Sequence, residues 1–314
     1  STMDIRVVPL PTPIPPTQPY TICDDNQDGV SCDFDLASLV PDMLNGLTSY
    51  TITFHETLQD AELGNTAINT SVPYCSIIPF MQTIYVRAVD INTGCWSVIP
   101  IVLEVNPSPI APVNLNDIEV CDQDNNTQNG FTLVDLTVRT ADVLAQQPLA
   151  AGNYTVTYYT SSTAAQQGTS PIIPATNFLA FNGQPIWVRV EDNSTGCYNI
   201  GTFNVIINRP LLLTTPTPLS VCDDDANPND GFHSFDLTVR DVMITQGLSG
   251  YTVTYYPTLA DAQNVTNAIG TPTAYTNLTA PVQTLGVRVT SAAGCYSVTT
   301  LDIRVLPIPT PNTN

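Results

Sequence analysis

An internal repeat of about a hundred residues constrains this chain more than any other feature of its sequence. Cys23, Cys121 and Cys222 occupy equivalent positions in segments that match on both sides. Each cysteine ends a short apolar segment, is followed by aspartate, and opens an acidic loop that contains glycine. Length alone would predict about two domains, but three copies of one unit predict three.

Secondary-structure signals recur in the same order inside each copy. After the acidic loop comes a Phe-Asp-Leu or Val-Asp-Leu motif and then a short helical stretch, such as residues 238–246 before Gly247. A strand with large apolar residues alternating with threonine follows at 50–54, 154–158 and 251–255. A hairpin closes the unit, and its turn leads into Cys95, Cys197 or Cys295.

These signals predict an all-β chain of tandem immunoglobulin-like β-sandwich repeats with short helical insertions, arranged as an elongated rod. The predicted repeats are 16–109, 110–211 and 212–314, and prolines after each hairpin predict stiff linkers. Residues 1–15 match the end of the third repeat, so we expect them to be the last strand and linker of a preceding repeat in a longer array. The strand order stays open, because the Cys-Trp-Cys spacing of true immunoglobulin domains is absent.

Charge composition excludes several classes of partner. The eight basic residues are all arginine, and with 28 acidic residues the net charge is −20. Such a chain has no basic surface for nucleic acid or anionic lipid. A hydrophobic content of 43% predicts a folded chain, and no apolar run is long enough for a membrane span.

Eight cysteines point to an oxidising, exported location. Because a duplicated unit should be self-sufficient, we expect the opening and closing cysteines of each repeat to pair with each other. Two cysteines private to the first repeat should form a local bond. Free cytosolic thiols or a zinc site are the alternatives, but no CxxC occurs and only two histidines are present. The predicted pairs are Cys23 with Cys95, Cys121 with Cys197, Cys222 with Cys295, and Cys32 with Cys75.

The acidic loops predict calcium sites. The first loop fits D-x-[DN]-x-[DN]-G, the opening of a calcium loop in which oxygen ligands alternate and glycine permits a sharp turn. The third loop is similar and the second is poorest in charge, while the alternative is that these residues only form turns. Bound calcium would clamp each repeat beside its cysteine. The candidate ligands are Asp24, Asn26, Asp28 and Asp35; Asp122, Asp124, Asn126, Asn129 and Asp135; and Asp223, Asp225, Asn227, Asp230 and Asp236.

No catalytic constellation recurs in the repeats. His55 and His233, the two histidines, are replaced in the other copies. Arg87, Arg189 and Arg288 share one repeat position, which favours a structural pairing with an acidic or carbonyl group over a substrate site. We therefore expect no enzymatic activity and no catalytic residue.

The fixed order of these motifs resembles the tandem repeats of SprB-type gliding-motility adhesins and related cargo of the type IX secretion system in gliding bacteria. The resemblance covers essentially the whole chain. It implies a structural stalk in a large extracellular cell-surface adhesin, with neighbouring repeats of the same chain as its partners. It also implies contact with substratum or surface polysaccharide, and with motility and secretion machinery through regions outside this chain. The alternative is a calcium-assisted carbohydrate-binding array of a secreted polysaccharide-degrading enzyme.

Overall fold

A computed structural model describes residues 3, 7–124 and 126–309. Residues 4–6, which carry most of the predicted strand at the N-terminus, lie outside the described residues. The chain divides into two compact units. The first comprises Ser1–Leu115, Thr137–Ile172 and Ile186–Thr202, and the second comprises Asn116–Leu136, Ile173–Pro185 and Phe203–Asn314. Each unit therefore combines most of one terminal repeat with part of the middle repeat.

Each repeat contains a four-stranded sheet with the same order of strands, in which the closing hairpin is central and the opening strand lies at one edge. The orders are β1-β4-β3-β2, β5-β10-β9-β7 and β11-β16-β15-β13. The strands are β1 Tyr20–Asp24, β2 Tyr50–His55, β3 Met81–Asp90 and β4 Trp96–Pro107; β5 Ile118–Cys121, β7 Tyr154–Tyr159, β9 Gln184–Asp192 and β10 Tyr198–Asn208; and β11 Leu219–Cys222, β13 Tyr251–Tyr256, β15 Val282–Ser291 and β16 Tyr296–Leu306.

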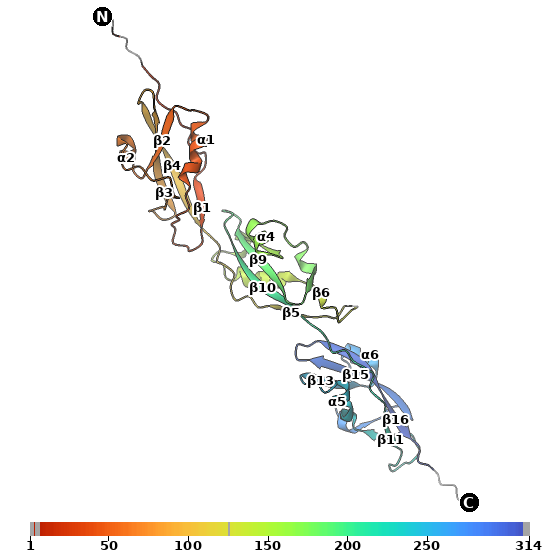
Figure 1. Ribbon diagram of the computed structural model, residues 1–314. Helices are drawn as coiled ribbons and strands as arrows, with labels where there is room; N and C mark the ends of the chain where they lie inside the picture. The colour runs from red at the N-terminus through yellow and green to blue at the C-terminus, as the bar shows by residue number, and fades with distance from the viewer. Residues whose placement is uncertain (1–2, 4–6, 125, 310–314) are drawn as a thin grey trace, which may run out of the picture. The chain divides into compact units, whose positions relative to one another are not determined.

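The opening strand runs parallel to the last strand of its own repeat, while the hairpin strands are antiparallel. In the register of the parallel pairs, Cys23 lies opposite Asn106, Cys121 opposite Asn208, and Cys222 opposite Leu306. Parallel neighbours require a long crossover connection, and here the rest of the repeat provides it. In the third repeat, β15 and β16 lie side by side with α6 against β15 (Figure 1).

A much smaller second layer faces these sheets. In the second and third repeats it is a two-stranded ladder, β6 Phe131–Val134 with β8 Phe178–Phe181, and β12 Ser234–Phe235 with β14 Tyr275–Thr276. In the first repeat it is a single bridge between Phe34 and Tyr74. The predicted mostly-β class of tandem immunoglobulin-like repeats is confirmed, with a parallel edge pair that the hairpin pattern did not indicate.

The described helices are short, and none is long and apolar enough to cross a membrane. The α-helices are α1 Val40–Leu44, α2 Leu58–Leu63, α3 Thr140–Leu144, α4 Ser162–Gln167, α5 Asp241–Ile244 and α6 Leu259–Asn264. The 3-10 helices are Leu36–Leu39, Leu136–Arg139, Ala151–Asn153, Ala175–Asn177, Leu237–Arg240 and Pro272–Ala274.

The Phe-Asp-Leu motif is a core and capping motif. Phe34 and Leu36 are buried in the core of the first repeat, and Phe235 and Leu237 in that of the third. The aspartate between each pair caps the 3-10 helix that follows it, as Asp35 does by accepting from the Ser38 N–H at 3.3 Å. The apolar pair thus anchors the chain between sheet and helix, while the acid satisfies the exposed helix end.

The repeated arginines have the predicted structural role. Arg87 Nη1 donates to the carbonyls of Ala61 and Glu62, both at 2.7 Å, at the end of α2. Its guanidinium also lies 4.3 Å from the centroid of the Trp96 ring. In the other repeats, Arg189 and Arg288 bond to the carbonyls of the equivalent helices and stack on the aromatic residue after the closing cysteine.

Candidate functional site

Two disulfides join the opening cysteine of one repeat to the closing cysteine of the next. Cys23 bonds Cys197, and Cys121 bonds Cys295, each across 174 residues. The Cα atoms are 5.5 Å and 5.4 Å apart, which is normal for a disulfide. The predicted pairs Cys23 with Cys95 and Cys121 with Cys197 are therefore wrong.

The reason lies in the parallel register of the edge strand. Cys23 sits opposite Asn106, near the end of β4, whereas Cys95 immediately precedes the first residue of the same strand. About eleven strand residues separate these positions, or about 36 Å at 3.3 Å per residue. Two Cα atoms more than about 7 Å apart cannot be bridged without moving the backbone. A repeat thus cannot bond its own two cysteines.

Cys95 and Cys222 are free thiols in the described structure, one half-buried and the other exposed. The predicted bond between Cys222 and Cys295 is also wrong, because Cys295 is taken by Cys121. Cys95 is the closing cysteine of the first repeat and Cys222 the opening cysteine of the third. They are therefore the two cysteines whose inter-repeat partner would belong to a further copy.

The predicted local bond between Cys32 and Cys75 is confirmed. It flanks the isolated bridge between Phe34 and Tyr74, where the other repeats have a longer ladder. The first repeat therefore holds its reduced second layer with a covalent bond in place of ladder hydrogen bonds.

The linker after each repeat is hydrogen-bonded to the repeat that follows. Gln147 donates to the carbonyl of Ile110 at 2.9 Å and accepts from its N–H at 2.8 Å. In the second unit, Ser297 Oγ and Gln246 Nε2 donate to the carbonyls of Leu211 and Leu212, at 2.6 Å and 2.7 Å. Each joint thus combines a disulfide with a linker backbone that side-chain groups hold in place.

We call residues 24–29 loop one, residues 122–130 loop two and residues 223–231 loop three. In loop one, the Asp24 carboxylate is buried and both of its oxygens accept backbone hydrogen bonds. Oδ1 accepts from the N–H groups of Asn26 and Gln27 at 3.1 Å and 2.9 Å, and Oδ2 from Gly29 at 2.7 Å. Asn26 and Asp28, two further predicted ligands, bond each other at 3.0 Å. Loop one is closed by its own groups.

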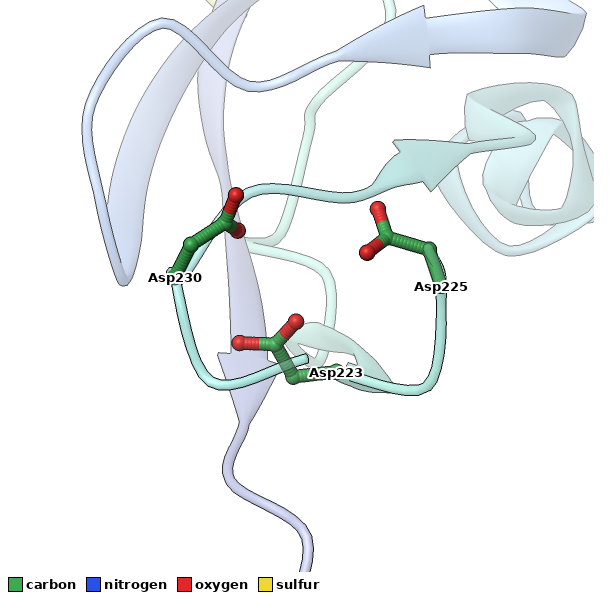
Figure 2. A group of neighbouring side chains, drawn as sticks. All are labelled: Asp223, Asp225 and Asp230. Carbon is green, nitrogen blue, oxygen red and sulfur yellow. The ribbon is translucent and has the colours of Figure 1, made fainter. Parts of the chain in front are cut away.

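Loop three leaves one oxygen of the equivalent aspartate without a partner. Asp223 is 2% exposed, its Oδ2 accepts from Gly231 N–H at 2.8 Å, and its Oδ1 is buried with no hydrogen-bond partner among the described residues. An unsatisfied buried polar atom of this kind costs about 1–3 kcal/mol. The carboxylates of Asp225 and Asp230 face the same space as Asp223 (Figure 2), and one oxygen from each of the three lies within 4.8 Å of the others.

Loop two repeats this arrangement with less charge. Asp122 is fully buried, its Oδ2 accepts from Gly130 N–H at 2.8 Å, and its Oδ1 has no partner among the described residues. Asn129 stands where loop three has Asp230, and each side chain accepts from the N–H of the residue two positions later, Phe131 and Phe232. The Arg209 guanidinium lies against Gly130, where an added Cβ would come within 2.6 Å of Nη2. The sequence analysis did not predict that Arg209 would lie beside this loop. The available signal was that Arg209 does not occupy a position shared by arginines of other repeats.

The predicted closing ligand of loop three, Asp236, is not among the three carboxylates of the loop-three group. Asp236 Oδ1 caps a 3-10 helix by accepting from Thr238 N–H at 3.0 Å, as Asp35 does in the first repeat. Asp135 directly precedes the equivalent helix Leu136–Arg139. Asp124 and Asp225 accept from the N–H groups of Asn126 and Asn227, which are thus bonded to the loop through their backbones. The closing positions predicted by analogy with a calcium loop therefore stand at helix starts.

The two histidines have structural surroundings. His55 is buried, with its ring nitrogens 2.7 Å from Asn65 O and 2.9 Å from Thr53 Oγ1. His233 lies beside loop three, with Nε2 3.4 Å from Asp224 Oδ1. The hydrogen bond to Ser234 O, followed by interactions with Asp224 and Asp225, raises the pKa of His233 above its usual value.

Tandem immunoglobulin-like repeats joined by disulfides define the class of this chain as an extracellular multidomain structural protein. The chain belongs to the Flavobacterium inter-domain disulphide bond domain family, which matches residues 19–109, 117–211 and 218–309. No curated protein sequence matches the chain.

Solved structures of tandem domains give low global similarity. The I-band fragment I67–I69 from titin is 9% identical, with coverage of 83% of this chain and 88% of that chain and a TM-score of 0.28. Domains 3–5 of Drosophila OTK are 10% identical over 95% and 96% of the two chains, also with a TM-score of 0.28. Chicken CNTN1 FN1–FN3 domains are 13% identical over 82% and 91%, with a TM-score of 0.26. Scores this low carry no argument about function.

Proposed function

We propose that this chain is part of the stalk of a large secreted cell-surface adhesin, in which disulfides between successive repeats carry tension. The role is structural and requires no catalytic residue. The observation that carries the proposal is the pair of inter-repeat disulfides with identical spans of 174 residues.

The two disulfides overlap along the sequence, and this overlap limits how far the chain can extend. About 270 residues separate Cys23 from Cys295, or about 95 nm of fully extended backbone at about 3.5 Å per residue. With both bonds intact, the shortest covalent path runs through them and only about 76 residues, or about 27 nm. A repeat that unfolds under tension therefore releases little length, and its neighbours keep it close to its folded position.

The same pattern gives the two free thiols a role. In a longer array, Cys95 would bond the opening cysteine of the preceding repeat, and Cys222 the closing cysteine of the following one. Every repeat would then be bonded to both neighbours. Secretion into an oxidising environment is required for such bonds to form and persist.

Single-molecule force spectroscopy on the oxidised chain, held at its two ends, tests the role in tension. We expect unfolding to release about 70 nm less contour length between the outer cysteines than in the chain reduced with TCEP. The Cys23→Ser/Cys121→Ser variant should lose the inter-repeat restriction but extend about 15 nm less than the reduced chain, because its Cys32–Cys75 bond still closes 43 residues. Cys32→Ser/Cys75→Ser should keep the inter-repeat restriction. Equal extension of the oxidised and reduced chains would refute the proposal.

A role in gliding and export by the type IX secretion system is the finer part of the proposal. It is supported by the resemblance to SprB-type repeats and by membership of a Flavobacterium family. Antibody against this chain should label the surface of intact cells of the source bacterium and should block their attachment to glass. Labelling only after cell lysis would contradict a surface location.

A further inference from the structure

We propose that loop three binds a calcium ion through the carboxylates of Asp223, Asp225 and Asp230. The inference does not depend on the stalk role. It rests on the buried oxygen of Asp223 that has no partner, on the convergence of three carboxylates, and on the contrast among the three equivalent loops.

The Asp223 side chain supports a cation site more strongly than acidic crowding does. Its Oδ1 is removed from solvent and has no donor among the described residues, although Oδ2 of the same group is bonded to Gly231. The Asp223 carboxylate faces the space between Asp225 and Asp230 (Figure 2), and one oxygen of each of the three groups lies within 4.8 Å of the others. A positively charged ligand in that space would satisfy Oδ1 and offset the repulsion among three negative groups.

The loop backbone already orients the group. One oxygen of each carboxylate is held by a backbone N–H, at 2.8 Å for Asp223, 2.9 Å for Asp225 and 2.9 Å for Asp230. The second oxygen of each is thereby positioned without a large loss of side-chain freedom on binding. Two oxygens bound to one calcium ion at 2.3–2.6 Å can be up to about 5 Å apart, which accommodates a group whose atoms lie within 4.8 Å.

Loop two supports the assignment of a calcium site to loop three, because it is an equivalent loop in the same chain. Asp122 has the same buried oxygen at the equivalent position, again with no partner among the residues that the structure describes. Loop two differs by Asn129 in place of Asp230 and by Arg209 beside Gly130, so it should bind calcium more weakly. Loop one should not bind, because Asp24 already accepts three backbone hydrogen bonds. This order of calcium affinity differs from the order of the sequence match to the calcium-loop motif, which is best in loop one.

Calorimetric titration of the oxidised 314-residue chain with calcium chloride, after removal of metal and in 0.15 M NaCl, tests the assignment. NMR signals of the Gly231 and Phe232 amides report loop three separately. We expect saturable binding at loop three with a dissociation constant of about 10⁻⁵–10⁻³ M. Asp225→Asn and Asp230→Asn change exposed side chains, and each should weaken this binding at least tenfold.

Two matched variants sharpen the test. Asp28→Asn removes an exposed carboxylate from loop one and should leave calcium binding unchanged. Asn129→Asp gives loop two the three carboxylates of loop three and should strengthen its binding about tenfold. The proposal is overturned if the Gly231 and Phe232 signals do not respond to calcium, if Asp28→Asn weakens binding as much as Asp230→Asn, or if magnesium binds with the same dissociation constant.

Discussion

Loop one and loop three both follow the opening strand and cysteine of their repeats, and both begin with a buried aspartate. The two aspartates differ in the hydrogen bonds that they accept. In loop one, the glycine that donates to Asp24 lies five positions after it, whereas Gly231 lies eight positions after Asp223. The tighter turn brings two further N–H groups onto Asp24 Oδ1. In the wider turn, the N–H of Asn227 bonds Asp225, and Asp223 Oδ1 has no hydrogen-bond partner in the described part of the chain. Loop length thus decides how many backbone N–H groups of the loop reach the buried carboxylate.

Substitution of the cysteines beside these loops should give the largest difference in protein stability. Cys23 is bonded and Cys222 is free, although they occupy equivalent positions. We expect Cys23→Ser to lower the free energy of unfolding of the first unit by up to about 5 kcal/mol, because the bond closes a very long loop. Cys222→Ser should change stability by less than about 0.5 kcal/mol. Denaturant unfolding of the oxidised variants measures both, and equal effects would contradict the assigned bonds.

Substitution of the buried aspartates should give the second-largest difference in stability, measured in the absence of divalent cations. Asp24→Ala leaves three N–H groups without their acceptor, and we expect it to lower the free energy of unfolding by about 3 kcal/mol. Asp223→Ala loses one hydrogen bond but also removes an unsatisfied oxygen, so its cost should be below about 1 kcal/mol. Thermal unfolding in EDTA compares the two variants. A larger loss for Asp223→Ala would show that loop three is already satisfied.

Arg209 should account for part of the difference between loops two and three. Its guanidinium lies beside Gly130, whose N–H bonds Asp122, so it opposes a cation there. We expect Arg209→Gln to strengthen calcium binding at loop two about threefold, in line with about 0.6 kcal/mol of screened repulsion. Binding at loop three should stay unchanged in the same titration. A decrease at loop two would mean that Arg209 supports the site.

The smallest expected effect is a pH dependence at His233. Its pKa is raised by the hydrogen bond to Ser234 O and by Asp224 and Asp225, so protonated His233 favours the folded state. This contribution is fully present below the unfolded pKa of about 6.5 and is lost as pH rises through the higher folded value. His233→Gln should remove it, with a change in stability of about 0.5 kcal/mol at most. NMR titration of the ring protons against pH measures the shift, and a pKa below 6.5 would contradict it.

Most of the secondary structure could be predicted from the sequence because its signals are local. The Tyr-Thr alternation marks β2, β7 and β13, and the second strand of each closing hairpin begins directly after its cysteine. The Cys32–Cys75 bond was also predictable, since no other repeat offers these cysteines a partner. The sequence offered candidate ligands in all three loops, and the motif ranked loop one with loop three. The structure distinguishes Asp24 from Asp223 by their backbone hydrogen bonds, which no residue pattern contains.

The sequence alone determined the repeat, the mostly-β class and which residues lie beside each cysteine. Only the tertiary structure decided which cysteines meet. The physical reason is the parallel pairing of β1 with β4, which places Cys23 beside Asn106 and therefore far along the strand from Cys95. Strand direction and register are long-range properties. The sequence is therefore compatible with disulfides within each repeat, whereas the folded chain forms disulfides between neighbouring repeats.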